Sequence, residues 1–315
     1  MRPASYLRDL QMPTITVIIP TLGTRPSELD RAIASALSQQ NASVTVLVVI
    51  NGDRYAPDFP HRLRCIDGVQ LLHVSEAGVS RARLEGRRQV NTPFFAFLDD
   101  DDELLPDAME IRLRAHSEAK AAVVATNGYC DREGVREINF PHFPSSSADP
   151  VHALLEENWL ASAGGLYRTE RVSPDDLEAL PNYLEMTYLA FRLALRAPII
   201  LISQPTFIIH MGATQQASMS SNYHNETPSV LAAMEKLTSN RELQRRLQRK
   251  RAAALHTCSL AALKDGDLRT AWGHHLASLK LVGGMRYLSY TRHLLTPHRT
   301  SSALARTEQL NERGN

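Results

Sequence analysis

The sequence predicts an α/β protein whose central sheet is mostly parallel and flanked by helices. In the first half, short apolar stretches rich in β-branched residues show no polar alternation, which is typical of strands buried on both faces. Segments with apolar residues at helical spacing separate these stretches, as expected for parallel strands joined by crossover helices. After about residue 228 the pattern becomes wholly helical, so we also expect a helical C-terminal appendage.

The expected elements alternate along the first 125 residues. Each strand is an apolar run closed by a polar or turn-forming residue, as Pro20 closes the first and Asn51 the second. Each helix repeats apolar side chains every three or four residues, as Leu29, Ile33 and Leu37 do. We expect strands over 15–19, 44–50, 69–74, 94–98 and 121–125, and helices over 26–39, 79–90 and 108–119.

The remainder is expected to be less regular. Prolines and serines over 140–147 predict a loop, and residues 163–168 fit either a short strand or a backbone segment of close approach. The other elements that we expect are a helix over 183–195 and two strands, 199–202 and 206–209. We place a boundary near residue 227, between an α/β domain (1–227) and a helical region (228–315).

Composition narrows the class of protein. A formal net charge of +1 gives no reason to expect a nucleic-acid partner. The three cysteines are scattered, which argues against a disulfide framework and fits a reducing cytoplasm. We find no apolar run near the roughly 20 residues of a membrane helix and no long apolar N-terminal signal. We therefore expect a cytoplasmic protein, with peripheral contact at the inner face of the cell membrane left open.

Four consecutive aspartates, Asp99 to Asp102, follow the apolar run 94–98. Carboxylates crowded at the mouth of a buried strand are unfavourable unless a cation lies among them. A divalent metal that bridges a diphosphate would satisfy this requirement, because hard cations bind carboxylate oxygens and keep positions open for phosphate. The alternative is an acidic turn that caps the next helix, near Pro106, but one aspartate would suffice for that.

Other acidic or phosphate-binding motifs do not fit. A calcium EF-hand loop counted from Asp99 would need glycine where Leu104 stands. Phosphatases with an aspartate nucleophile would need threonine or valine where Glu103 stands. Neither a Gly-x-x-x-x-Gly-Lys loop nor a Gly-x-Gly-x-x-Gly fingerprint occurs. A nucleotidyltransferase would need a glycine-rich basic loop after the first strand, whereas residues 20–25 contain one glycine.

Four motifs occur in a fixed order between residues 14 and 210. They are Val17-Ile18-Ile19-Pro20-Thr21, Ser35-Ala36-Leu37-Ser38-Gln39, Gly78-Val79-Ser80-Arg81-Ala82-Arg83, and Phe97 to Asp102 with Pro106-Asp107 downstream. In this order and spacing the chain resembles the bacterial family 2 glycosyltransferases of the GT-A fold. The resemblance implies a Rossmann-like sheet and inverting, metal-assisted transfer of a sugar from a nucleotide-diphosphate sugar to a glycan or lipid-linked hydroxyl. It also implies a Mn²⁺ or Mg²⁺ cofactor and a role in polysaccharide biosynthesis.

The same resemblance assigns candidate site residues. Asp101 would be the principal metal ligand, and His210 is a further candidate, weighed against a hydrogen-bonded histidine at a strand end. Asn51 stands where the family commonly has an aspartate that contacts uracil, and its amide can donate and accept, so we expect a UDP-sugar donor. The expected nucleotide-sugar contacts are Pro20, Thr21, Asn51, Arg83, Asp99 and Asp100.

Inverting transfer needs a general base for the acceptor hydroxyl. The family keeps it in Glu-Asp-x-x-Leu-x-x-Arg, which residues 185–192 match except that Met186 replaces the aspartate. Glu185 is therefore the expected base. Met186, together with Leu84 in place of the family's asparagine, supports an alternative, a non-catalytic sugar-nucleotide or glycan-binding module derived from a glycosyltransferase.

The helical C-terminal region carries a basic stretch. Its members are Arg241, Arg245, Arg246, Arg249, Lys250 and Arg251. Such a stretch fits a solvated helix face. It also fits attraction to anionic lipid head groups, which would bring the protein to a lipid-linked acceptor.

Overall fold

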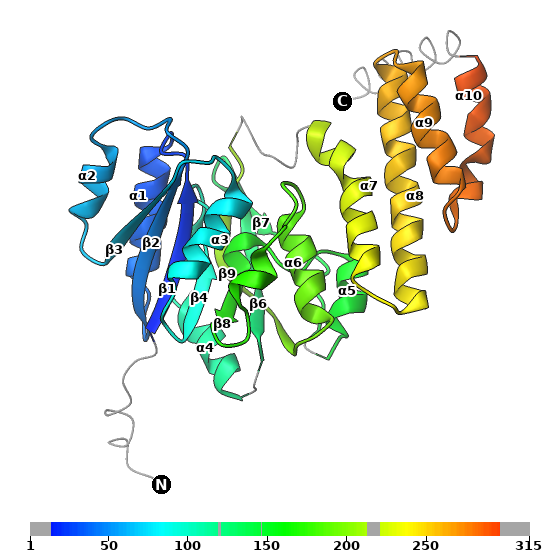
Figure 1. Ribbon diagram of the computed structural model, residues 1–315. Helices are drawn as coiled ribbons and strands as arrows, with labels where there is room; N and C mark the ends of the chain where they lie inside the picture. Colours follow the sequence, from blue (N-terminus) through cyan, green and yellow to red (C-terminus); the bar gives the residue numbers. More distant parts are fainter. Residues whose placement is uncertain (1–13, 119–120, 146, 213–220, 297–315) are drawn as a thin grey trace. The chain divides into compact units, whose positions relative to one another are not determined.

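The computed structural model describes residues 14–118, 121–145, 147–212 and 221–296. The chain divides into two compact units, Met1–Thr214 and Gln215–Asn315. The boundary that we placed near residue 227 falls within helix α7 (Ser221–Lys236). The first unit is built around one mixed sheet, and the described part of the second is helical (Figure 1).

The first half of the sheet is parallel. Its strands are β3 (Val69–Val74), β2 (Ser43–Asn51), β1 (Thr14–Thr21) and β4 (Phe94–Phe97), hydrogen-bonded in that order. Thr21 pairs with Ile50 across β1 and β2, and Ile18 pairs with Phe97 across β1 and β4. Because these strands run in the same direction, their carboxyl ends meet at one edge, where α/β sheets bind ligands.

The second half of the sheet is mixed. The order continues with β8 (Gly165–Arg168), β6 (Val123–Arg132), β9 (Ile199–His210) and β5 (Glu103–Leu104), and β7 (Val135–Ile138) pairs with β6. β8 lies antiparallel between β4 and β6, whereas β6 and β9 are parallel. The two strands predicted over 199–202 and 206–209 are one strand. Pro205 has no N–H to donate to the β6–β9 ladder. It lies where the register of that ladder shifts, and the pairing resumes beyond it.

Helices cover the sheet. They are α1 (Pro26–Leu37), α2 (Phe59–Arg64), α3 (Val79–Gln89), α4 (Ala108–Glu118), α5 (Pro150–Glu156) and α6 (Glu185–Ala194). The helices that we did not predict, α2 and α5, have six and seven residues, too few to show a periodic pattern. Gly86 brings α3 close to the sheet, because a Cβ there would lie 2.6 Å from Ile18 Cγ2.

The core explains why these strands lack polar alternation. Ile15, Val17 and Ile19 of β1 belong to a buried apolar cluster that also contains Leu29 and Ile33 of α1. The alternate residue Ile18 is equally buried. Both faces of the parallel half are therefore covered, as the continuous apolar runs predicted.

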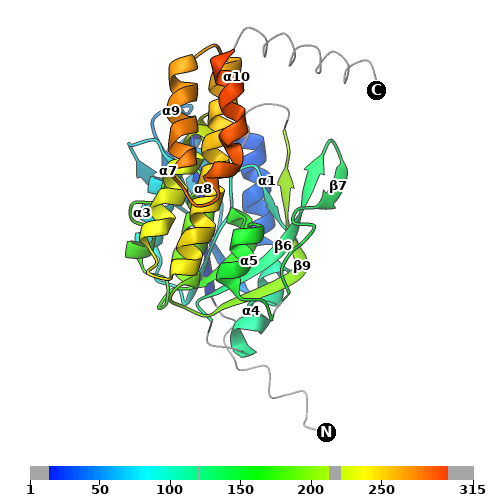
Figure 2. The same cartoon turned by 90° about the vertical axis from the view of Figure 1, so that its right-hand side faces the viewer.

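The second unit contains α7, α8 (Arg241–Lys264), α9 (Leu268–Leu279), a 3₁₀ segment (Gly284–Tyr290) and α10 (Thr291–Leu295). Figure 2 shows these helices running side by side. The α8–α9 turn contains Gly266, whose φ of +80° favours glycine, and the Asp267 side chain accepts from the Thr270 N–H to cap α9. The predicted helical appendage is thus present. Within the described ranges, no helix is both long and apolar enough to cross a membrane.

Candidate functional site

The carboxyl ends of three strands are tied together by side chains that we predicted as donor contacts. At the end of β1, Thr21 Oγ1 donates to Asp100 Oδ2 at 2.6 Å. The Asn51 amide nitrogen, at the end of β2, donates to the Thr21 carbonyl at 2.9 Å, and its oxygen accepts from the Gly78 N–H at 3.0 Å. Pro20 is buried beside Thr21 in β1. These contacts align the strand ends with the start of α3.

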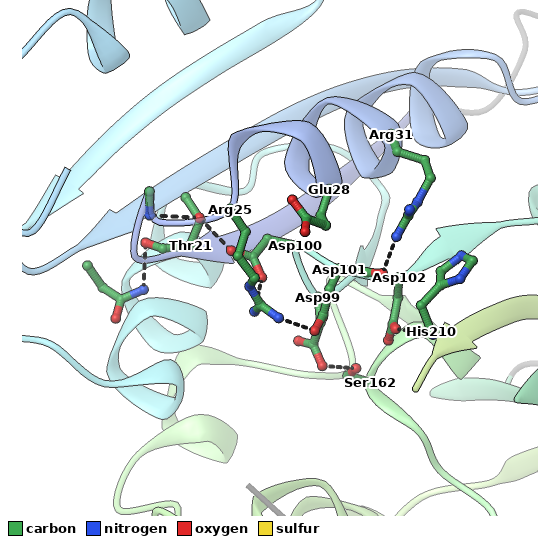
Figure 3. A network of polar contacts seen from close by, with 12 residues as sticks. Thr21, Arg25, Glu28, Arg31, Asp99, Asp100, Asp101, Asp102, Ser162 and His210 are labelled. Carbon is green, nitrogen blue, oxygen red and sulfur yellow. Dashed lines mark hydrogen bonds and ion pairs between the residues drawn. The ribbon is translucent and has the colours of Figure 1, made fainter. Parts of the chain in front are cut away.

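The four aspartates after β4 lie in different surroundings (Figure 3). Asp99 accepts from Arg83 at 2.7 Å and from Ser162 Oγ at 2.6 Å. Asp100 is buried, whereas the Asp101 side chain is 32% exposed. Asp102 is buried and accepts from the backbone N–H of His210 at 3.3 Å. The run therefore does not form four equivalent ligands around one point.

Burial opposes the ionisation of two carboxylates in this loop. It raises the pKa of Asp100 to about 6, although the Thr21 hydrogen bond and the Arg25 charge act in the opposite direction. Burial also raises the pKa of Asp102 well above its usual value, and repulsion by Asp99 and Asp101 adds to the rise. Positive charge placed beside these groups would favour their ionised forms.

Arg83 joins two predicted site residues that are distant in the sequence. Its guanidinium donates to Asp99 Oδ1 and to Glu185 Oε1, each at 2.7 Å. The residue is 1% exposed and lies over the Phe97 ring, 5.8 Å from its centroid. Burial alone would lower the pKa of Arg83, but the charges of Asp99 and Glu185 outweigh it and raise that pKa. We call this group the buried arginine centre.

Glu185 is the first residue of α6. It follows Leu184, whose φ of 58° lies in the left-handed region that non-glycine residues seldom occupy. Met186, the next residue, is buried in the core. The strained turn before α6 thus directs Glu185, and not residue 186, toward Arg83.

His210 reaches the acidic loop through the pairing of β5 with β9. Its Nε2 lies 2.7 Å from Glu103 Oε1, and the same Glu103 oxygen lies 2.8 Å from Arg31 Nε. The imidazole is therefore engaged with Glu103, while the backbone of the same residue contacts Asp102.

Sequence reasoning did not identify three side chains as partners of the aspartates. Arg25 pairs with both Asp100 and Asp101, and Arg31 donates to the Asp101 carbonyl at 2.8 Å. Ser162 holds the second oxygen of Asp99. The sequence places both arginines just after the first predicted strand end, and so near the site, but it does not show which carboxylates they contact. We call Arg25, Asp100 and Asp101 the exposed arginine centre.

Known proteins resemble this chain in sequence and in fold. Residues 16–166 match the model of the family described as "Glycosyl transferase family 2". The chain is therefore similar to family 2 glycosyltransferases over slightly less than half of its length. A relative of Escherichia coli strain K12, "Uncharacterized glycosyltransferase YibD", is 26% identical over 156 residues, which cover 46% of this chain and 42% of YibD. The matched segment therefore spans less than half of that relative.

Solved structures of TarS from S. aureus share the fold. The TarS 1–349 complex with UDP-GlcNAc has a TM-score of 0.56 at 13% identity, covering 85% of this chain and 91% of TarS 1–349. The complex with UDP has a TM-score of 0.52 at 14% identity, covering 77% and 71%. The predicted GT-A-like α/β class with C-terminal helices is thereby confirmed.

Two carboxylates of the acidic loop could hold a divalent cation. Within the ranges that the structure describes, no group of three or more His, Cys, Asp and Glu side chains is arranged to hold a metal. Asp100 and Asp101, however, are adjacent carboxylates that already bind one cationic group, the Arg25 guanidinium. Mg²⁺ sites commonly use one or two carboxylates and complete their coordination with phosphate and water. The donor set fits such an ion, provided that Arg25 withdraws.

Proposed function

We propose that this protein is an inverting, metal-assisted glycosyltransferase that moves a sugar from a nucleotide-diphosphate sugar to a hydroxyl of a glycan or lipid-linked acceptor. The observation that carries the proposal is the buried arginine centre. One guanidinium holds both Asp99 of the acidic loop and Glu185 of α6, 2.7 Å from each. The residues expected at the donor diphosphate and at the acceptor hydroxyl are therefore fixed relative to each other, as a displacement reaction requires.

The donor would bind at the shared edge of β1, β2 and β4. Thr21, Asn51 and Pro20 shape the strand ends there, and Asp99 and Asp100 lie beside them. Two TarS structures of the same fold hold UDP and UDP-GlcNAc. We infer a UDP-sugar as the donor class, with polysaccharide assembly as its setting.

Glu185 would act as the general base. Its Oε1 accepts from Arg83, so Oε2 would take the proton from the acceptor hydroxyl. The hydroxyl oxygen then forms a bond to the anomeric carbon as the bond to the diphosphate oxygen on the opposite face breaks. The configuration at that carbon is inverted, and the nucleoside diphosphate leaves.

Asp101 and Asp100 would hold a Mn²⁺ or Mg²⁺ ion. That ion, when bound with the donor, offsets the negative charge that develops on the leaving diphosphate. His210 stays a candidate third ligand, which would first have to leave Glu103. Arg83 would contribute fixed positive charge beside Asp99.

A transfer assay tests this proposal. The full chain would be incubated with a panel of UDP-, GDP- and TDP-sugars and saccharide acceptors, with Mn²⁺ or with EDTA, and nucleoside diphosphate release measured. We expect metal-dependent release with at least one UDP-sugar, and its loss in Asp101→Asn. Donor binding without any release would favour the non-catalytic binding module, for which the apolar, buried Met186 is the supporting observation.

A membrane surface is the partner that we infer for the second unit. Arg241, Arg245 and Arg249 are exposed and lie one helical turn apart on α8. Gly283 packs against Arg249, and the 3₁₀ segment that follows exposes Met285 (62%) and Leu288 (50%). Positive charge beside exposed apolar side chains suits the surface of an anionic bilayer. Arg251 is excluded from this surface because it pairs with Glu235.

Vesicle co-sedimentation tests the membrane surface. We expect binding to vesicles that contain phosphatidylglycerol and weak binding to pure phosphatidylcholine. Replacing the three exposed α8 arginines by glutamine should abolish the difference. A control protein with glutamine at Arg62, Arg88 and Arg114 has the same net charge and should bind as the wild type does. Equal loss in both would remove the proposal.

A further inference from the structure

Arg25 is placed to act as a cation within the acidic loop. It is the residue before α1, and its carbonyl accepts from the Leu29 N–H at 3.0 Å, which fixes the backbone. From there its side chain extends to the loop, where one terminal nitrogen pairs with Asp100 and the other with Asp101 (Figure 3). The guanidinium thus bridges the two carboxylates that fit a divalent ion.

The Arg25 guanidinium is held by opposite charges but is accessible to solvent. Burial lowers the pKa of Arg25, but the charges of Asp100 and Asp101 outweigh it and raise that pKa, so the guanidinium stays charged. The side chain is nevertheless 44% exposed. Exposed ion pairs contribute little net stability, and a long arginine side chain can turn into solvent at small cost.

We propose that Arg25 is an exchangeable counter-ion that competes with the divalent metal for Asp100 and Asp101. In the metal-free protein its single positive charge partly offsets the two carboxylates and keeps them oriented. A metal ion must displace the guanidinium before it can bind. This inference rests on the proposed function, because it takes these carboxylates to be the metal ligands.

The two other arginines near the acidic loop contact different groups from those that Arg25 contacts. Arg31, on the α1 helix that follows Arg25, donates to the Asp101 backbone carbonyl and pairs with Glu103, but it does not pair with the Asp100 or Asp101 carboxylates. Arg83 pairs with Asp99 and is buried. If Arg25 competes by direct contact, its replacement should change the metal affinity. Replacement of Arg31, which carries the same charge nearby, should not.

Mn²⁺ titration of the full chain without nucleotide, followed by the EPR signal of free Mn²⁺, tests the inference. Arg25→Gln should bind Mn²⁺ roughly tenfold more tightly than the wild type, because no ion pair has to be broken. Arg31→Gln removes the same charge nearby and should change affinity by only about twofold. Arg25→Lys, whose single ammonium cannot bridge both carboxylates, should lie between wild type and Arg25→Gln. Thermal melting would verify that each variant is folded.

Three results would overturn the inference: equal affinity in Arg25→Gln and wild type, an equal gain in Arg31→Gln, or no Mn²⁺ binding by any variant. The transfer assay separates this inference from the proposed function. Metal-dependent turnover with unchanged Mn²⁺ affinity in Arg25→Gln would leave the function standing and remove the competition. Absence of turnover with every donor would remove the function, whatever the titration shows.

Discussion

The buried and the exposed arginine centres have the same composition, one guanidinium between two carboxylates, but different surroundings. The Arg83 side chain is 2% exposed and joins Asp99 to Glu185, whereas the Arg25 side chain is 44% exposed and joins Asp100 to Asp101. A buried pair cannot be broken without leaving an uncompensated charge, whereas an exposed pair can exchange with water or ions. The two centres thus differ in the burial of the arginine and not in that of the aspartates, since the Asp99 and Asp101 side chains are 35% and 32% exposed.

This difference assigns separate tasks to neighbouring residues. Asp99 is held on both oxygens, by Arg83 and Ser162, and so serves as a rigid connection to Glu185. Asp101 is one third exposed, and its side chain can meet a ligand. The predictions below test whether the two centres differ as described.

The largest effect is expected at the carboxylate that the buried centre orients. Glu185→Gln should lower the transfer rate by about 10²–10⁴-fold, because the amide cannot accept the acceptor proton. UDP affinity, measured by calorimetry, should remain within about twofold, since we propose that Glu185 acts on the acceptor and not on the donor. Glu178→Gln, which alters an exposed glutamate paired with Arg88, is the control. Normal turnover in Glu185→Gln would assign the base to another residue.

The next effect is on stability. Arg83→Met should lower the free energy of unfolding by about 3 kcal/mol, because it leaves Asp99 and Glu185 without their shared partner. This is the lower end of the range for a buried pair, as both carboxylates are partly exposed. Urea unfolding followed by circular dichroism measures it. A loss below about 1 kcal/mol would show that the buried centre is not a structural connection.

His116 tests the effect of burial on a titratable group away from both centres. Its Nε2 lies 2.9 Å from the Leu166 carbonyl oxygen, and burial lowers its pKa to about 4. Because the folded pKa is below the unfolded value of about 6.5, the neutral form contributes stability that is fully present above pH 6.5. That stability is lost as the pH falls toward 4, by at most about 3 kcal/mol. Urea unfolding at pH 7, 5 and 4 should show a smaller acid loss in His116→Phe. An unchanged loss would contradict the assignment.

The smallest effect is expected at the exposed centre. Arg25→Met should change the free energy of unfolding by less than about 1 kcal/mol, because the guanidinium is 44% exposed and Asp100 keeps its hydrogen bond from Thr21. The same urea experiment as for Arg83→Met gives the comparison directly. Equal losses in the two variants would mean that burial does not distinguish the centres.

The parallel half of the sheet could be predicted from the sequence because its signals are local. An apolar run closed by Pro20-Thr21 or by Asn51 fixes both the strand and its end, so the expected 69–74 coincides with β3 and the expected 44–50 lies within β2. The mixed half of the sheet could not be predicted from the sequence, because its strands pair with segments that are distant in the chain. Nothing near Glu103 indicates that it pairs with Ile208 to form β5.

In the candidate site, too, the sequence identified residues but not their long-range partners. Motif spacing identified Thr21, Asp99 and Glu185 as site candidates, and the structure links each of them to another candidate, through Asp100 or Arg83. It could not identify Arg25 as a partner of Asp100, because 75 residues separate them. Long-range ion pairs depend on where the sheet brings strand ends together, which no local pattern records.

Calorimetric titration of UDP into the full chain tests the central claim most directly, namely that the acidic loop binds a metal–diphosphate group. The account predicts measurable UDP binding with Mn²⁺, little binding with EDTA, and loss of the Mn²⁺-dependent part in Asp101→Asn. Equal UDP binding with Mn²⁺ and with EDTA, unchanged by Asp101→Asn, would contradict it.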